Sequence, residues 1–266
     1  MNLHRPFPRQ LLVIALILCV PVVLGAGPTP AAVSGFNTYV ASVESRLAEQ
    51  HRSSADFLAP LDAAQQDQLR RGQMVFQKLT PQPGNDLPGA LLHHWRGSAF
   101  APGAHAADLE HLLGHYEDYP RLYAPQVLQG KVLSRKSDDL QAFMRVSQRH
   151  VITVVLDTWY NVAYGRLDQQ HIYTISRSTK IAEVASPGTP SERDLSSEED
   201  HGFLWLMNTY WTFEERDGGL YMQLESVTLT RNIPPGLAWA VRPFIESIPR
   251  DSLEFTLSST LKALQK

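Results

Sequence analysis

The chain is poor in cysteine and has no excess of either charge. Its single cysteine, Cys19, lies in the apolar N-terminal segment. Removal of that segment would leave no thiol, which excludes disulfides and cysteine catalysis from the remaining chain. Lysine and arginine number 24 against 27 aspartates and glutamates, a formal net charge of −3. Because no basic block stands out either, we expect no nucleic-acid partner.

The sequence motifs of several enzyme classes are also missing. There is no Gly-x-Ser-x-Gly nucleophile elbow, no Walker phosphate loop and no Gly-x-Gly-x-x-Gly after a strand. His111 and His115 stand four apart on an expected helix, but the glutamate of a zinc-protease helix does not lie between them. We therefore expect no metal and no cofactor, and the sequence assigns no catalytic residue.

Residues 1–27 have the layout of a secretory signal peptide. Arg5 and Arg9 precede the apolar stretch Leu11–Leu24, and three small residues follow it. The apolar stretch is shorter than the roughly 20 residues that a membrane span requires. The segment predicts export to the periplasm or the exterior. The alternative is an uncleaved anchor that tethers the same domain outside the cytoplasm.

Residues 28–60 are expected to form a linker and an amphipathic helical extension. Apolar residues recur there at helical spacing. They are Phe36, Tyr39, Val40, Val43 and Leu47. The opposite face is not rich in lysine or arginine, which favours packing on the main domain over a membrane surface.

Residues 61–266 are expected to form the main domain. The expected strands cover 73–80, 90–101, 127–135, 140–149, 151–164, 171–184, 203–214 and 220–231, and the expected helices cover 61–71, 106–116, 119–123 and 249–263. Turn residues between the later strands indicate meander connections. This order predicts an α+β fold in which a curved antiparallel sheet buries its concave face against the C-terminal helix.

Three segments of the main domain carry a family resemblance. They are His201–Pro234, Asp118–Val127 and Ile248–Leu253. Together they resemble the START-like (SRPBCC) superfamily, which groups lipid-transfer START domains, birch-pollen-allergen-like proteins and aromatic polyketide cyclases. The resemblance covers roughly residues 61–266. It implies a helix-grip fold around a hydrophobic cavity that binds lipids, sterols, polyketides or other apolar molecules, and it transfers no active site.

Aromatic and apolar residues on the expected strands are candidates for lining such a cavity. One face of the strand 203–214 carries Trp205, Met207, Trp211 and Phe213, and other strands add Trp159, Phe143 and Tyr173. Residues of this kind also form an ordinary packed core. The two interpretations are compatible, since the wall of a cavity is also core.

Glu225 is the acid of greatest interest because it lies in the middle of an apolar strand. If it is buried it needs a partner, and Arg177 and Arg145 are the candidates. Such a pair would anchor the polar head of a ligand or hold the sheet together. The alternative is a solvated pair on the convex face.

The register of the last hairpin decides which face Glu225 occupies. A two-residue turn at Asp217-Gly218 places Trp211 opposite Leu224, whereas a three-residue turn places Trp211 opposite Glu225. A slip of one residue reverses the face of every side chain on the strand.

The leading functional hypothesis is that the exported domain binds a hydrophobic small molecule or lipid in an internal cavity, for transport or sensing. One alternative is a cavity enzyme of the polyketide cyclase/dehydrase type. Another is an interaction module whose core is filled by its own side chains. The expected partner is the hydrophobic molecule; a transient membrane contact is compatible with the sequence, and a protein partner is not specified.

Overall fold

The structure, a computed structural model, describes residues 27–80, 87–149, 153–232 and 238–265, with side chains from residue 247 onward in the last stretch. The predicted signal peptide therefore lies, except for Gly27, outside the described residues. In the part that is described, no helix is long and apolar enough to cross a membrane.

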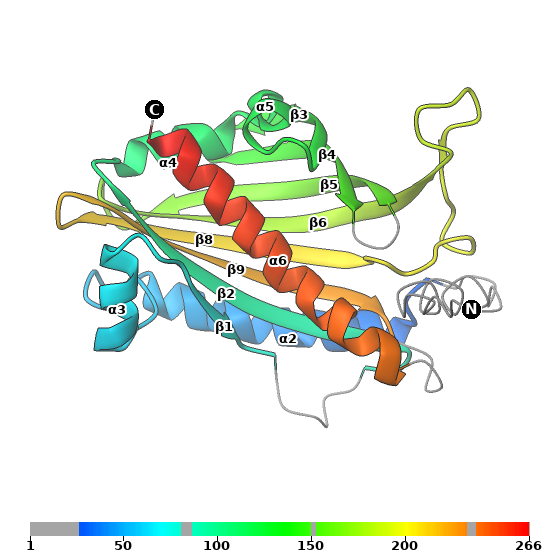
Figure 1. The fold of residues 1–266 in the computed structure, drawn as a ribbon, viewed down its shortest axis with the longest axis horizontal. Coiled ribbons are helices and arrows are strands. Elements are labelled where there is room, and N and C mark those ends of the chain that lie inside the picture. The colour runs from blue at the N-terminus through cyan, green and yellow to red at the C-terminus, as the bar shows by residue number, and fades with distance from the viewer. Residues whose placement is uncertain (1–26, 81–86, 150–152, 233–237, 266) are drawn as a thin grey trace, which may run out of the picture.

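The chain forms one twisted antiparallel sheet with helices on both of its faces (Figure 1). The helices are α2 (Pro30–Gln50), α3 (Ala63–Arg70), α4 (Ala106–Gly114), η1 (Tyr116–Asp118), α5 (Tyr119–Leu122) and α6 (Ala238–Leu264). The strands are β1 (Val75–Lys78), β2 (Ala90–Pro102), β3 (Val127–Lys136), β4 (Asp139–Arg149), β5 (Thr153–Arg166), β6 (His171–Ala185), β7 (Arg193–Asp194), β8 (Leu206–Arg216) and β9 (Gly219–Arg231). Their order in the sheet is β1-β2-β9-β8-β6-β5-β4-β3, and β7 pairs with β6 beside this path.

One face of the sheet, called the inner face, packs against α6. A buried cluster fills this interface and includes Trp211, Leu224 and Leu257. α6 packs closely on β2 at Gly97, where a Cβ atom would lie 2.5 Å from the Leu257 side chain. The predicted helix-grip fold is thus confirmed, with a curved antiparallel sheet around the C-terminal helix.

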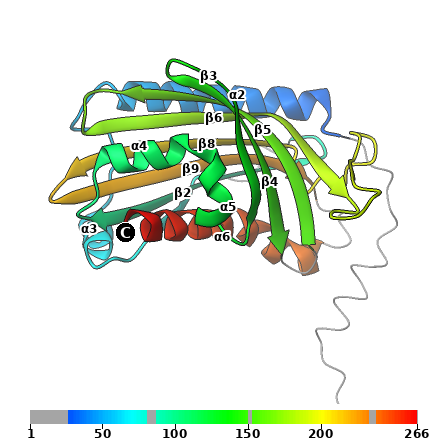
Figure 2. The same cartoon turned by 90° about the horizontal axis from the view of Figure 1, so that it is seen from above.

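The opposite face, called the outer face, is covered by α2 (Figure 2). Thr29 caps this helix by accepting a hydrogen bond from the Ala32 amide at 3.1 Å. The apolar stripe of α2 lies against the sheet residues Tyr210, Val227 and Leu229. β9 is consequently buried along almost its whole length on both faces, instead of alternating between buried and exposed residues.

The hairpin between β8 and β9 has the shorter of the two turns considered from the sequence. Asp217 and Gly218 both have positive φ angles, 56° and 75°, as a two-residue type I′ turn requires. Trp211 therefore lies opposite Leu224, and Glu225 lies opposite Tyr210. Because Trp211 and Leu224 face α6, Glu225 points to the outer face.

The helix boundaries differ from expectation mainly at α6. The sequence predicted a helix over residues 249–263. The helix instead begins at Ala238 and continues through Pro249. A proline inside a helix removes one backbone donor and usually kinks or breaks the helix, but the turns after Pro249 are held against the sheet by Leu253 and Leu257.

Candidate functional site

Three of the ten predicted ligand-facing residues lie on the inner face. Trp211 and Phe213 belong to the buried cluster beneath α6. Met207 lies on the same face of β8, and the Tyr160 hydroxyl donates to its sulfur at 3.9 Å. These three residues keep the position that the alternation of the strand predicts.

The other seven side chains lie on the outer face. They are Trp205, Trp159, Phe143, Tyr173, Glu225, Arg177 and Arg145. The expectation that the four aromatic residues among them line the side covered by α6 is therefore wrong, whereas the sequence left the face of Glu225 and its arginine partners open. Tyr160 and Ala142 fill the inner core, so their neighbours Trp159 and Phe143 point away from it and stack with ring centroids 5.2 Å apart. Alternation separates two faces of a strand, but it does not identify the inner one when helices cover both.

Tyr173 and Trp205 contact the α2 layer in different ways. The Tyr173 ring stacks on His51, the C-cap of α2, with centroids 4.1 Å apart. Trp205 precedes β8, so the alternation of that strand does not extend to it. It joins the buried cluster beneath α2, and its indole N–H donates to Asp200 at 3.2 Å.

A group of inner-face residues further along β9 forms what we call the inner patch. Its members are His93, Trp95, Met207, Thr209 and Thr228. In register, Thr228 lies opposite both His93 of β2 and Met207 of β8. His93 and His94 point to opposite faces of β2, and His94 lies on the outer face beside Glu225.

The inner patch contains polar atoms that lack a hydrogen-bond partner. The indole nitrogen of Trp95 and the hydroxyl of Thr228 are both buried and have no hydrogen-bond partner among the described residues. At the other end of the inner face Phe213 is fully buried, whereas Trp95, Met207 and Thr209 keep partial exposure. The inner face is therefore tightly filled at one end and less completely covered at the inner patch.

Three tyrosines from η1 and α5 close the filled end. Tyr116 and Tyr119 stack with ring centroids 4.5 Å apart, and Tyr123 packs edge-on against Tyr119. The Tyr123 hydroxyl hydrogen-bonds to Thr260 of α6 at 3.0 Å, and burial raises the pKa of Tyr123 to about 12. The sequence analysis did not single out these tyrosines, although their close spacing is visible in it.

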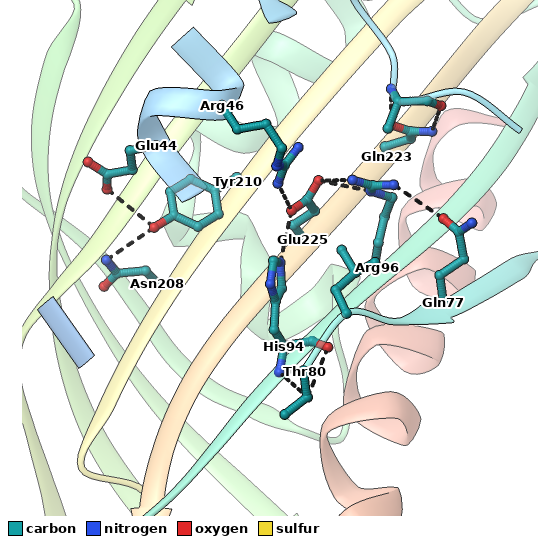
Figure 3. Close-up of polar contacts among 12 residues, drawn as sticks. Glu44, Arg46, Gln77, Thr80, His94, Arg96, Asn208, Tyr210, Gln223 and Glu225 are labelled. Carbon is teal, nitrogen blue, oxygen red and sulfur yellow. Dashed lines mark hydrogen bonds and ion pairs between the residues drawn. The ribbon is translucent and has the colours of Figure 1, made fainter. Parts of the chain in front are cut away.

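Glu225 lies at the centre of a buried ionic cluster beneath α2 (Figure 3). Its carboxylate accepts hydrogen bonds from Arg46 of α2 at 2.6 Å, from His94 at 2.9 Å and from Arg96 at 2.8 Å. The Tyr39 hydroxyl contacts the second nitrogen of the His94 ring at 2.9 Å. The side chain is neither ligand-facing nor solvated, which corrects both alternatives considered from the sequence.

Burial raises the pKa of Glu225, but the hydrogen bond from His94 and the charges of Arg96 and Arg46 outweigh it, so that the pKa falls to about 2. The carboxylate is therefore ionised and both of its oxygens are bonded. This arrangement fastens α2 to the sheet.

The expected arginine partners of Glu225 form other ion pairs. Arg177 donates to Glu44 of α2 at 2.7 and 2.8 Å. Arg145 pairs with Asp157 and Glu192, each at 2.7 Å. The sequence did not indicate Arg46 as the partner because it belongs to the extension outside the family resemblance.

Glu183, near the end of β6, and Asp200, in the loop before β8, form an acidic pair. Glu183 accepts hydrogen bonds from the backbone and the ring of His201 at 3.0 and 2.7 Å. Burial and the neighbouring Glu183 charge raise the pKa of Asp200 to about 6. Among the described residues no group of three or more histidines, cysteines or acids is arranged to hold a metal ion.

No protein-family model and no curated protein matches this chain. Solved structures do match it, and some of them are described as STAR-related lipid transfer or START superfamily proteins. A STAR-related lipid transfer protein from Xanthomonas axonopodis has 14% identity and a TM-score of 0.47, over 72% of this chain and 99% of that one.

Two further matches have similar scores. The Zhui aromatase/cyclase from Streptomyces sp. R1128 has 11% identity and a TM-score of 0.47, over 66% of this chain and 94% of that one. Human STARD10 has 11% identity and a TM-score of 0.45, over 77% of this chain and 81% of that one.

Proposed function

We propose that this protein binds a hydrophobic small molecule or lipid between the inner face of the sheet and α6, as a carrier or sensor outside the cytoplasm. The observation that carries the proposal is the inner patch. Trp95 and Thr228 each present a buried polar atom without a partner there. A buried polar group without a hydrogen bond is unfavourable, so a ligand that supplies one gains affinity from it.

The chemistry around these two atoms fits an apolar ligand with a small polar head. Met207 and Trp95 offer apolar surface that keeps partial exposure, and methionine adapts to ligands of irregular shape. The indole N–H donates, and the Thr228 hydroxyl donates or accepts. The head of the ligand would thus bond to β2 and β9, and its apolar body would lie along β8 beneath α6.

The direct test is mass spectrometry of the intact protein under native conditions, followed by organic extraction. We expect wild-type protein to carry a hydrophobic molecule or to take up a fluorescent fatty acid or sterol. Met207→Trp should block uptake by filling the site. Thr228→Val should weaken it by about five-fold, the equivalent of one hydrogen bond.

A matched control separates the site from general effects of the substitution. Thr179→Val removes the same atoms at an exposed position on β6 and should leave uptake unchanged. Wild-type protein that carries no hydrophobic molecule and takes up neither probe would overturn the proposal. Uptake that is unaffected by Met207→Trp would place the ligand elsewhere and would also overturn it.

Export is a separate part of the proposal and has its own experiment. Expression of the full chain in a bacterium, followed by cell fractionation and N-terminal sequencing, should yield protein outside the cytoplasm that begins near residue 28. Unprocessed protein in the cytoplasmic fraction would contradict export. Unprocessed protein on the membrane, facing outward, would support the anchored alternative.

A further inference from the structure

A hollow lies on the outer face of the sheet, apart from the inner patch. It has a volume of about 420 Å³ and is lined by the segment that follows α2, by α3 and by strands β2, β8 and β9. Pockets that bind small molecules commonly measure about 300–1,000 Å³. We call this hollow the outer pocket. The sheet itself separates it from the inner patch.

The side chain of Ser98 lies at the floor of the outer pocket. Ser98 is opposite Gln223 in register, on the face that points away from α6. It is 1% exposed, and its hydroxyl has no hydrogen-bond partner in the structure. A buried hydroxyl in a protein is usually bonded to protein or water, so this one is available to a bound molecule.

Among the other polar side chains of the outer pocket, those on the strands are already paired, whereas Ser54 and Asp56, exposed in the segment after α2, are polar members of its lining. Gln223 accepts from the Ala59 amide at 2.8 Å and donates to the Ala59 carbonyl at 2.9 Å. Arg216 pairs with Glu214 at 3.0 Å, and its guanidinium lies over the Tyr221 ring at 4.2 Å. The two charges on the strands around this pocket therefore neutralise each other.

One wall of the outer pocket is apolar. Leu58 and Leu61 come from the segment after α2, and Leu69 comes from α3. The three leucines form one small hydrophobic cluster with Tyr221. The pocket thus combines an apolar wall, an ion pair on the strands, exposed polar residues after α2 and one buried hydroxyl without a partner.

We propose that the outer pocket binds an uncharged amphipathic small molecule. Its apolar body contacts Leu58, Leu61 and Leu69, and its single hydroxyl, carbonyl or amide group hydrogen-bonds to Ser98. A charged group does not fit beside Ser98, because this buried hydroxyl is neutral and a buried charge needs a charged partner. This site does not depend on the proposed function, since it lies on the opposite face of the sheet.

The probe for this site is 6-propionyl-2-(dimethylamino)naphthalene, a neutral dye with one carbonyl group whose emission shifts to the blue in apolar surroundings. Full-length protein should bind it saturably. Ser98→Ala should weaken binding by about five-fold, which corresponds to the loss of one neutral hydrogen bond. Leu58→Trp should abolish binding by filling the pocket from a half-buried position.

Controls distinguish the outer pocket from the inner patch and from unfolding. Met207→Trp on the inner face should leave the affinity of the outer pocket within two-fold of wild type. The melting temperature of Ser98→Ala should equal or exceed that of wild type, because the lost hydroxyl has no partner. No saturable binding, or binding lost in Met207→Trp but kept in Leu58→Trp, would overturn the proposal.

Discussion

Arg46 of α2 donates a 2.6 Å hydrogen bond to Glu225 of β9, although 179 positions separate the two residues in the sequence. The bond joins the N-terminal helix to the centre of the sheet. Glu225 is 3% exposed, and His94 and Arg96 also contact its carboxylate. α2 is therefore a layer of the folded domain rather than a loosely attached extension.

Removal of the Glu225 charge should destabilise the protein strongly. Glu225→Gln leaves the buried Arg96 guanidinium without its charged partner, and such changes typically cost about 3–5 kcal/mol. Urea denaturation at pH 7 measures the loss. Glu49 of α2 forms an exposed ion pair with Arg52, which follows the helix. The control Glu49→Gln should change the free energy of unfolding by less than about 0.5 kcal/mol. Equal effects of the two substitutions would contradict a special role for the buried cluster.

The same cluster should make the protein sensitive to acid. The folded-state pKa of Glu225, about 2, lies below its ordinary value of 4.5. Its contribution to stability is thus complete above about pH 4.5 and is lost as the pH falls toward 2. A pH series of denaturation curves should show this loss in wild type and a smaller one in Glu225→Gln.

Asp200 should have the opposite effect on how stability depends on pH. Burial and the Glu183 charge raise its folded-state pKa to about 6 from 3.8, so ionisation of Asp200 lowers stability as the pH rises between these values. Asp200→Asn should raise the melting temperature at pH 7.5 and leave it unchanged at pH 3.5. The half-buried Asp194, paired with Lys180, supplies the control Asp194→Asn. A lower melting temperature of Asp200→Asn at pH 7.5 would refute the expected repulsion.

Trp205→Ala should separate stability from ligand uptake. The sequence alone placed Trp205 in the ligand cavity, but the side chain belongs to the cluster beneath α2. The substitution should cost about 3–5 kcal/mol of stability, as large-to-small core changes do. Uptake of a fluorescent fatty acid by the folded fraction should match wild type. A lost uptake in folded protein would show that the outer face contributes to the ligand site.

Gly97→Val should disturb the contact between β2 and α6. A Cβ atom at position 97 would lie 2.5 Å from Leu257 and 3.0 Å from Phe76. Overpacking of this kind costs about 1–3 kcal/mol. The variant should melt earlier, and Gln129→Val, at an exposed position of β3, should not. A melting temperature equal to wild type would mean that α6 moves aside freely.

The sequence predicted the fold well because its signals are local. The Asp217-Gly218 turn, the alternation along β8 and the apolar stripe of the last helix each indicate one element. The face that Glu225 occupies depends on whether the turn before β9 has two or three residues, and the sequence left this choice open. The second covering layer, α2, was predicted as a helix, but its position on the outer face depends on Arg46 and Phe36 meeting side chains distant in the chain.

Most of the predicted site residues lie on the outer face of the sheet, which the sequence did not indicate because this position too depends on the second covering layer. Trp159 and Phe143 have the composition of a cavity wall, yet they lie on the face opposite α6. Burial on both faces removes the contrast between polar and apolar positions that would identify the inner one. Trp95 and Thr228 were missed because a polar atom without a partner is a property of the folded structure and leaves no mark on composition.

The pairing of Gln223 with Ala59 has a consequence for how such a chain can change. One side-chain amide gives this backbone both the donor and the acceptor that a neighbouring strand would provide. Only a primary amide of this length supplies both, because glutamate cannot donate and asparagine is shorter. A change at position 223 would therefore leave the amide or the carbonyl of the buried residue Ala59 without its partner.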